Sequence, residues 1–115
     1  MSNQAILPPN ESAGVSLADV VTPVGNGIVS RTVLNTPELR AVEFAFAEGQ
    51  ELTEHTSTSR ALIQILTGAC DFVVAGETRK MRAGDLLHLV PKTPHALRAT
   101  EAMTMLLVLA PERKS

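Results

Sequence analysis

The sequence contains no tryptophan, no tyrosine and only one cysteine. A single cysteine excludes an internal disulfide and any zinc site built from several thiolates. Cys70 lies in the β-like run from Ala69 to Val74, where a small apolar filler is its expected role. A nucleophilic cysteine would need a nearby histidine and a lowered pKa, and the local sequence indicates neither.

Clustered positive charge and aromatic side chains are also scarce. The net charge is −2 at pH 7, the ten basic residues are scattered, and aromatic residues make up 3% of the chain. Proteins that bind nucleic acid usually present a basic stripe along the phosphates or aromatic rings on which bases stack. We therefore expect no nucleic-acid partner.

Long hydrophobic runs are missing as well. No apolar run approaches the roughly 18 residues that a membrane-spanning helix requires, and the first residues lack the features of a signal peptide. The apolar share of 44% and the mean hydropathy of +0.13 are nevertheless typical of a globular protein. These features predict a cytoplasmic protein without a membrane partner.

The 115 residues are enough for one domain with one modest core. We expect an N-terminal tail over 1–26, a β-domain over 27–112 and a C-terminal tail over 113–115. Within the first tail, Ser16 is placed to cap a short helical turn that extends to Val21 and that Pro23 would end.

From residue 27 onward the pattern is one of short β-rich runs separated by turn residues. About eight strands are expected, and no helix of normal length. This pattern predicts an all-β fold, a single antiparallel β-barrel or jelly roll. The expected strands cover residues 28–34, 39–46, 61–66, 70–74, 79–82, 86–90, 95–99 and 103–109.

The first segment with a regular spacing begins at Gly49. Five residues separate Gly49 from His55, and Gly68 follows His55 by thirteen positions. Glycine is favoured where a strand reverses with a positive φ. We therefore expect Gly49 and Gly68 to shape turns at either side of the histidine.

The second segment begins at Gly84-Asp85, which opens an apolar strand. His95 follows Gly84 by eleven positions, at the end of the proline-bearing loop that starts at Pro91. Pro94 also precedes this histidine directly. Two prolines stiffen the approach to His95 and would hold its ring in a fixed direction.

Together the two segments resemble the paired motifs of the cupin superfamily. The resemblance implies a cupin-type jelly roll that binds one divalent metal ion (Fe, Mn, Ni or Zn) through three histidines and a glutamate. His55 and His95 match two of these ligands. Ser57 stands where the motif has its second histidine, and Ala61 stands where it has glutamate. Two of the four metal ligands of the cupin motif are therefore replaced. A pocket that binds a metal ion and a pocket that binds none both remain possible.

Alternation along a strand predicts the pocket. If His55 faces the interior and one strand continues from it, Ser57, Ala61 and Ile63 share its face. This face is polar at one end and apolar further along, as expected for a small-molecule pocket.

The opposite face of the same run is also largely apolar, with Leu62 and Leu66 on either side of Gln64. Such a face must be covered, either by another sheet or by a second subunit. Small cupins similar to this chain usually pair through this face, so a homodimer is expected.

Two further side chains have alternative roles. His88 interrupts an apolar strand and could point inward as a third metal ligand, or outward as a hydrogen-bonded structural residue, which we favour. Glu43 interrupts another strand and could serve in the cavity as a base or ligand. A solvated position on the outer side of its strand is the favoured alternative for Glu43.

Three functions remain in competition, and no catalytic residue is assigned. The first is a module that binds a small organic ligand through His55 and His95. The second is a metal-dependent enzyme of the oxygenase or isomerase type, with a non-standard third ligand such as His88. The third is a barrel scaffold without activity.

Overall fold

The computed structural model describes residues 4–112, so the expected tail over 113–115 and the first three residues lie outside the described part. Within that part, nine strands follow one short 3-10 helix, η1 (Leu17–Asp19). The strands are β1 (Ile28–Asn35), β2 (Arg40–Phe46), β3 (Glu51–His55), β4 (Arg60–Thr67), β5 (Ala69–Val74), β6 (Glu77–Arg82), β7 (Leu86–Leu89), β8 (His95–Ala99) and β9 (Met103–Ala110).

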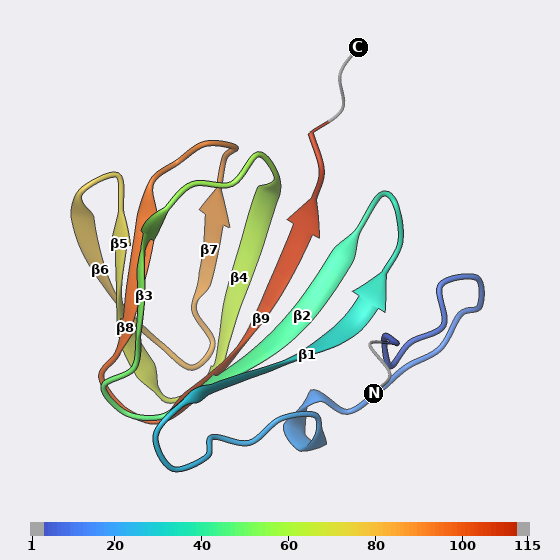
Figure 1. Cartoon of the computed structure of the whole chain (residues 1–115), viewed down its shortest axis with the longest axis horizontal. Helices are drawn as coiled ribbons and strands as arrows, with labels where there is room; N and C mark the ends of the chain where they lie inside the picture. Colours follow the sequence, from blue (N-terminus) through green and yellow to red (C-terminus); the bar gives the residue numbers. More distant parts are fainter. Residues whose placement is uncertain (1–3, 113–115) are drawn as a thin grey trace.

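The strands form two antiparallel sheets that face each other (Figure 1). The large sheet has the order β1-β2-β9-β4-β7, and the small sheet has the order β3-β8-β5-β6. The predicted all-β, cupin-like jelly roll is confirmed. The two sheets are not joined into a closed barrel, so the fold is a jelly-roll sandwich.

The core lies between the sheets and follows from strand alternation. In β4, Ala61, Ile63 and Ile65 are buried, while Leu62 and Gln64 on the other face are exposed. Each fully buried aliphatic or aromatic side chain contributes about 1.5–3 kcal/mol to stability. The same alternation extends over the strands that complete the core cluster, which includes Phe46, Cys70, Phe72, Met81, Leu87, Leu89, Leu97, Ala99, Met103 and Met105.

The premise that one strand continues from His55 to Ile63 is wrong, whereas the strand expected over 61–66 is present in β4. Strand β3 ends at His55, and residues 56–59 form a loop before β4 begins at Arg60. Strand β3 itself was not expected, because residues 51–55 carry charged and polar side chains that do not alternate with apolar ones.

The helical turn near the N-terminus is shorter than predicted. Helix η1 has three residues, and Ser16 occupies the N-cap position without a side-chain hydrogen bond. Among residues 4–112 there is no helix with the length and apolar character needed to cross a bilayer.

The N-terminal segment runs along the outside of the large sheet (Figure 1). The amide of Ile6 donates to the carbonyl of Thr32 at 3.2 Å, and the amide of Leu7 donates to that of Val33 at 2.8 Å. These bonds cover part of the edge strand β1, whose free amides and carbonyls would otherwise be open to another chain.

The hairpin between β5 and β6 offers a test of local geometry. Its two turn residues, Ala75 and Gly76, have φ values of 50° and 83°. Two consecutive positive φ values are typical of a type I′ turn, in which asparagine is strongly preferred to alanine at the first position. We expect Ala75→Asn to stabilise the protein by about 1 kcal/mol, since alanine is strained in the left-handed region. Thermal unfolding measures the change, and an unchanged midpoint would contradict it.

Candidate functional site

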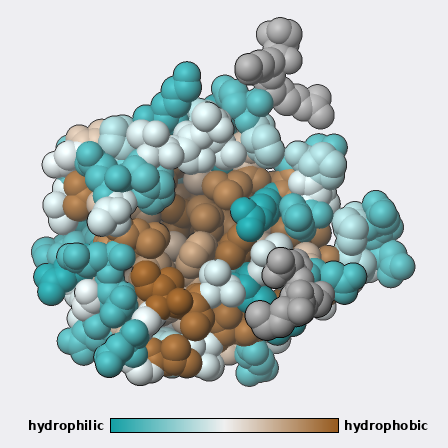
Figure 2. Space-filling model, viewed as in Figure 1, coloured by the Kyte–Doolittle hydropathy of each residue, from teal (hydrophilic) through white to brown (hydrophobic). Residues whose placement is uncertain are grey.

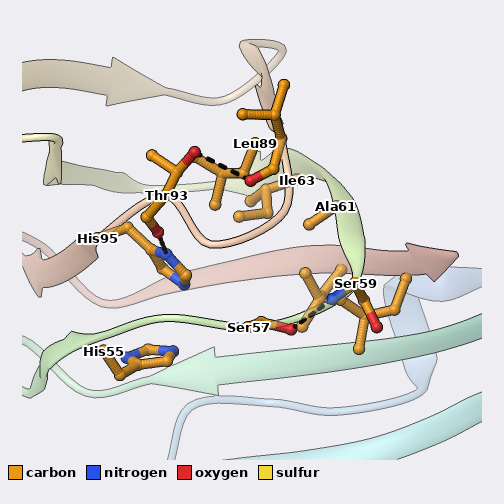
Figure 3. Close-up of a pocket in the computed structure, with 11 residues that line it drawn as sticks. His55, Ser57, Ser59, Ala61, Ile63, Leu89, Thr93 and His95 are labelled. Carbon is orange, nitrogen blue, oxygen red and sulfur yellow. Dashed lines mark hydrogen bonds between the residues drawn. The ribbon is translucent and has the colours of Figure 1, made fainter. Parts of the chain in front are cut away.

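A pocket of about 260 Å³ opens between the two sheets. Figure 2 shows an apolar hollow at this position, surrounded by hydrophilic side chains, and Figure 3 shows the lining residues. The pocket is lined by His55, Ser57, Ser59, Ala61, Ile63, Leu89, Val90, Thr93, His95, Leu107 and Leu109.

The two predicted histidines meet at one end of this pocket (Figure 3). His55 in β3 and His95 in β8 are direct cross-strand partners, and their ring centroids are 4.3 Å apart at an interplanar angle of 60°. His55 is exposed at the rim, whereas His95 is half-buried. Side chains that oppose each other on one face of an antiparallel pair are close enough to interact.

A β-bulge in β3 brings His55 onto this face. Leu52 pairs with Leu97, but His55 rather than Glu54 pairs with His95, so β3 carries one extra residue between the two pairs. Without that extra residue, alternation would turn His55 away from the face that Leu52 shares with the core. The bulge is therefore the local cause of the histidine pair.

Both histidine rings are held in the same tautomer. The Nδ1 atom of His55 lies 2.8 Å from the carbonyl oxygen of Thr53, and that of His95 lies 2.8 Å from the carbonyl oxygen of Thr93. A carbonyl oxygen can only accept, so each Nδ1 carries the proton and donates it. In the neutral rings, each Nε2 therefore keeps a lone pair for a ligand.

The pocket rim between the histidines and the wall carries hydroxyl groups. The Ser57 hydroxyl accepts from the amide of Ser59 at 3.1 Å, and the Thr93 hydroxyl donates to the carbonyl of Val90 at 2.9 Å. The amide of Lys92 donates to the carbonyl of Ser57 at 2.7 Å, which ties the loop before β4 to the loop before β8. These bonds hold the two rim loops next to each other.

Ser57, Ala61 and Ile63, the residues expected to share a face with His55, all line the pocket, although Ser57 lies in a loop rather than on the same strand. None of the described residues that line it is aspartate, glutamate, lysine or arginine. Leu89, Leu107 and other aliphatic side chains form the deeper wall. A ligand in this pocket would therefore meet two imidazoles, hydroxyls and hydrocarbon.

His88 lies on the other side of the large sheet. It pairs with Leu62, which is 43% exposed, and its Nε2 atom lies 2.9 Å from Nη1 of Arg60. In this arrangement His88 is outside the pocket and cannot join His55 and His95 as a third ligand. The outward alternative that the sequence favoured agrees with this position.

The motif glycines all have positive φ values: 86° at Gly49, 78° at Gly68 and 96° at Gly84. Next to Gly84, a carboxylate oxygen of Asp85 accepts from the amide of Arg82 at 3.0 Å. Pro91, the remaining motif residue, lies in the loop of residues 90–94 between β7 and β8.

Two other candidate residues lie outside the pocket. Cys70 is 1% exposed in the core, and burial together with the nearby Asp71 and Asp85 carboxylates raises its pKa to about 11. It therefore lacks the thiolate character of a nucleophile. Glu43 is 1% exposed on the reverse face of β2, so the prediction of a solvated position is wrong. The alternation of polar and apolar residues gave no sign of the segment that covers it.

The model of the cupin domain matches residues 42–110, which is more than half of the chain. This protein belongs to the cupin family. The match includes both motif segments and both pocket histidines. No curated protein sequence matches the chain.

Solved structures with a similar fold cover between 76% and 96% of the chain. A conserved protein of unknown function from Streptococcus pyogenes is 28% identical, with 96% of this chain and 97% of that one covered and a TM-score of 0.83. KdgF from Halomonas is also 28% identical, over 76% of this chain and 82% of its own, with a TM-score of 0.72. A salicylate 1,2-dioxygenase mutant from Pseudoaminobacter salicylatoxidans shares the fold, at 22% identity, 78% and 28% coverage and a TM-score of 0.70.

The residues present fit a metal site with two protein ligands, and not the four-ligand shell of the cupin motif. His55 and His95 hold their Nδ1 protons on backbone carbonyls, an arrangement that orients metal-binding histidines in general. Ser57 and Ala61 provide neither imidazole nor carboxylate. Within residues 4–112, no group of three or more histidine, cysteine, aspartate or glutamate side chains is placed to hold one ion.

Proposed function

We propose that the protein binds a small organic ligand in the pocket between the sheets, through the Nε2 atoms of His55 and His95. The observation that carries this proposal is the pair of Nδ1-protonated rings, 4.3 Å apart, at one end of a cavity of about 260 Å³. Two fixed acceptors beside an apolar wall match the usual make-up of a small-molecule site.

The lining also indicates the chemistry of the ligand. With no lysine or arginine among the described lining residues, a carboxylate ligand would lose its hydration without gaining an ion pair to a permanently charged side chain. An uncharged ligand with one or two hydroxyl or amide N–H donors would satisfy the Nε2 lone pairs and place its apolar part against Ile63 and Leu89. The volume favours a molecule smaller than a typical drug.

A metal-dependent enzyme is the second candidate, and the backbone-held tautomers favour it. A divalent ion would be held by His55 and His95, with water or substrate completing its coordination. Zinc and iron sites in enzymes usually have three or more protein ligands, so the affinity of this pair for metal would be modest. A bound ion would supply Lewis-acid chemistry, and the serine and threonine hydroxyls would orient the substrate.

The first test uses phenol as an uncharged probe with one donor and an apolar ring. Phenol should shift the side-chain 15N resonances of His55 and His95, since its hydroxyl donates to Nε2. His55→Ala and His95→Ala should each weaken binding at least tenfold, about 1.4 kcal/mol, whereas His88→Ala should leave it unchanged because His88 lies on the opposite face. Equal binding by all four proteins would contradict the ligand site.

Elemental analysis of the untagged protein, grown with supplemented metals, separates the two candidates. Near-stoichiometric Fe, Mn, Ni or Zn that disappears in His55→Ala and persists in His88→Ala supports the metal-dependent enzyme. If neither phenol nor metal binds, both proposed functions are contradicted, and the third hypothesis, a barrel scaffold without activity, is supported.

We further propose that the protein is a homodimer joined through the reverse face of the large sheet. Leu62 and Leu86 are 43% and 64% exposed there, beside the Arg60–His88 hydrogen bond. The N-terminal segment covers β1 and Glu43 but leaves these residues open. The cytoplasmic location, the absence of nucleic-acid and membrane partners, and the domain bounds stay predictions from the sequence.

Light scattering after size-exclusion chromatography should give twice the 12.2 kDa of one chain. Leu62→Asp should shift the protein to the monomer, because it places a charge in the apolar contact. Val24→Asp is the matched control, since Val24 is 50% exposed in the loop before β1 and belongs to neither β4 nor β7. A wild-type protein that elutes as a monomer at high concentration would overturn the dimer.

A further inference from the structure

A second cavity lies on the reverse face of the large sheet, beneath the N-terminal segment. Its volume is about 360 Å³. The sheet contributes Glu43, Leu66, Thr67 and Thr104 to its lining. The segment that covers it contributes Leu17, Ala18, Val21, Thr22 and Pro23.

This cavity is separate from the histidine pocket. Glu43 and Phe44 are neighbours in β2, so their side chains point to opposite faces of the sheet. Phe44 packs against the core between the sheets, while Glu43 points under the N-terminal segment. The two sets of lining residues have no member in common.

The Glu43 carboxyl is the unusual feature of the cavity. Its side chain is 1% exposed, and its Oε1 atom has no hydrogen-bond partner. Arg31, the cross-strand partner of Glu43 in β1, is exposed and forms no ion pair with Glu43 within residues 4–112. Asp19 of η1 is also exposed and, as a second carboxylate, could not neutralise Glu43. A buried acceptor without a partner costs free energy, and an ionised carboxylate costs far more. Burial accordingly raises the pKa of Glu43.

The two threonines that the sheet contributes already satisfy each other, and Thr22 of the covering segment is exposed. The hydroxyl oxygens of Thr67 and Thr104 are 2.8 Å apart, and the Thr104 amide donates to the Thr67 hydroxyl at 3.1 Å. Leu17, Val21 and Leu66 make the remaining wall apolar. Glu43 is therefore the group that a ligand would complete, and its tail would contact hydrocarbon.

We propose that this cavity binds a small organic ammonium ion, with the ammonium group on the Glu43 carboxylate and a short aliphatic tail between the N-terminal segment and the sheet. The positive charge would pair with the buried carboxylate, and the tail would bury apolar surface. An inorganic cation fits less well, because hard cations need about six oxygen ligands, and one carboxylate with the hydroxyls of Thr22, Thr67 and Thr104 provides too few.

The N-terminal segment should respond to the ligand. Its 3-10 helix is held by two long backbone hydrogen bonds, 3.5 Å from the Asp19 amide to the Ser16 carbonyl and 3.3 Å from the Val20 amide to the Leu17 carbonyl. Few internal bonds allow such a segment to open locally. A ligand that contacts both the segment and Glu43 stabilises the closed form by mass action.

The test titrates the full chain with n-butylammonium and follows backbone amides and the Glu43 side-chain carboxyl by NMR. Saturable shifts should appear at Leu17, Val21 and Thr104, with slower amide exchange in the covering segment. The 13Cδ resonance of Glu43 should move toward its ionised value, since the ammonium favours the charged form. n-Butanol and butyrate have the same tail, and each should bind at least tenfold more weakly.

Glu43→Gln keeps the shape and removes the charge, and should weaken n-butylammonium binding at least tenfold. Glu48→Gln is the matched control because Glu48 is exposed beyond the end of β2. Replacing both His55 and His95 with alanine should leave this binding intact. The proposal fails if n-butylammonium gives no saturable shifts, if n-butanol binds as tightly, or if Glu43→Gln binds equally well.

Discussion

Replacing Gly68 with alanine should destabilise the protein by roughly 2–5 kcal/mol, a large share of the stability of a small domain. Gly68 has a φ of 78°, where an L-residue pays about 1–2 kcal/mol. A Cβ atom there would also overlap the carbonyl oxygen of Ala102 and lie 2.7 Å from Cβ of Met103. Backbone cannot move aside as a flexible side chain can, so overpacking adds about 1–3 kcal/mol.

Urea unfolding of Gly68→Ala and Gly76→Ala separates the backbone strain at positive φ from the steric overlap of the added Cβ atom. Gly76 has a similar φ of 83°, but its added Cβ would meet nothing within 4 Å. Gly76→Ala should therefore lose only the conformational contribution, about 1–2 kcal/mol. Equal losses in the two variants would show that the close approach to Ala102 has no energetic consequence. If Gly68→Ala is too unstable to purify while Gly76→Ala folds, the steric cause is supported.

The sequence predicted the fold because strand signals in this chain are local. Alternation, β-branched residues and turn glycines occur within the few residues that form each strand. In β4, the alternation of Ala61, Ile63 and Ile65 with Leu62 and Gln64 gave both the strand and its buried face correctly. The motif spacing gave the family, and the match over residues 42–110 confirms it.

Strand β3 and its bulge could not be predicted in the same way. The polar residues around Thr53 and Glu54 have no period of two, and β3 is held by its pairing with β8, which lies forty residues later. The bulge that turns His55 toward His95 depends on that pairing. The bonds that fix the two rings go to the backbone carbonyls of Thr53 and Thr93, and because every residue carries such a carbonyl, the sequence held no signal for them either.

For Glu43, by contrast, the local pattern gave a definite prediction of a solvent-exposed side chain, and that prediction was wrong. A glutamate between apolar residues in a strand normally marks the solvent face. Here residues 17–23, about twenty positions earlier, cover it. That segment is largely apolar, but it has almost no regular structure, so no period along it indicates which face of the sheet it covers. Coverage by a distant segment is a tertiary effect that local patterns do not contain.

Replacing Phe72 with alanine should cost about 3–5 kcal/mol and also disturb the histidine pair. Phe72 is 2% exposed in the core, and its ring stacks on His95 with centroids 6.3 Å apart and an interplanar angle of 27°. The ring therefore supports His95 from within the core, while the carbonyl of Thr93 holds its Nδ1 atom. Loss of the ring leaves a cavity beside the imidazole and allows it to turn.

Phe46→Ala is the matched control, because Phe46 is fully buried in the same core and forms its ring contact with Phe44 rather than with a histidine. Both variants should lose similar stability in urea unfolding, but only Phe72→Ala should change the 15N resonances that report the His95 tautomer. Should either alanine variant unfold, Phe72→Leu and Phe46→Leu keep most of the apolar volume and test the same contrast. An unchanged His95 tautomer in both Phe72 variants would show that the backbone carbonyl alone holds the ring. A change specific to Phe72 would tie the chemistry of the pocket to the packing of the core beneath it, and the same variants should then lose affinity for phenol.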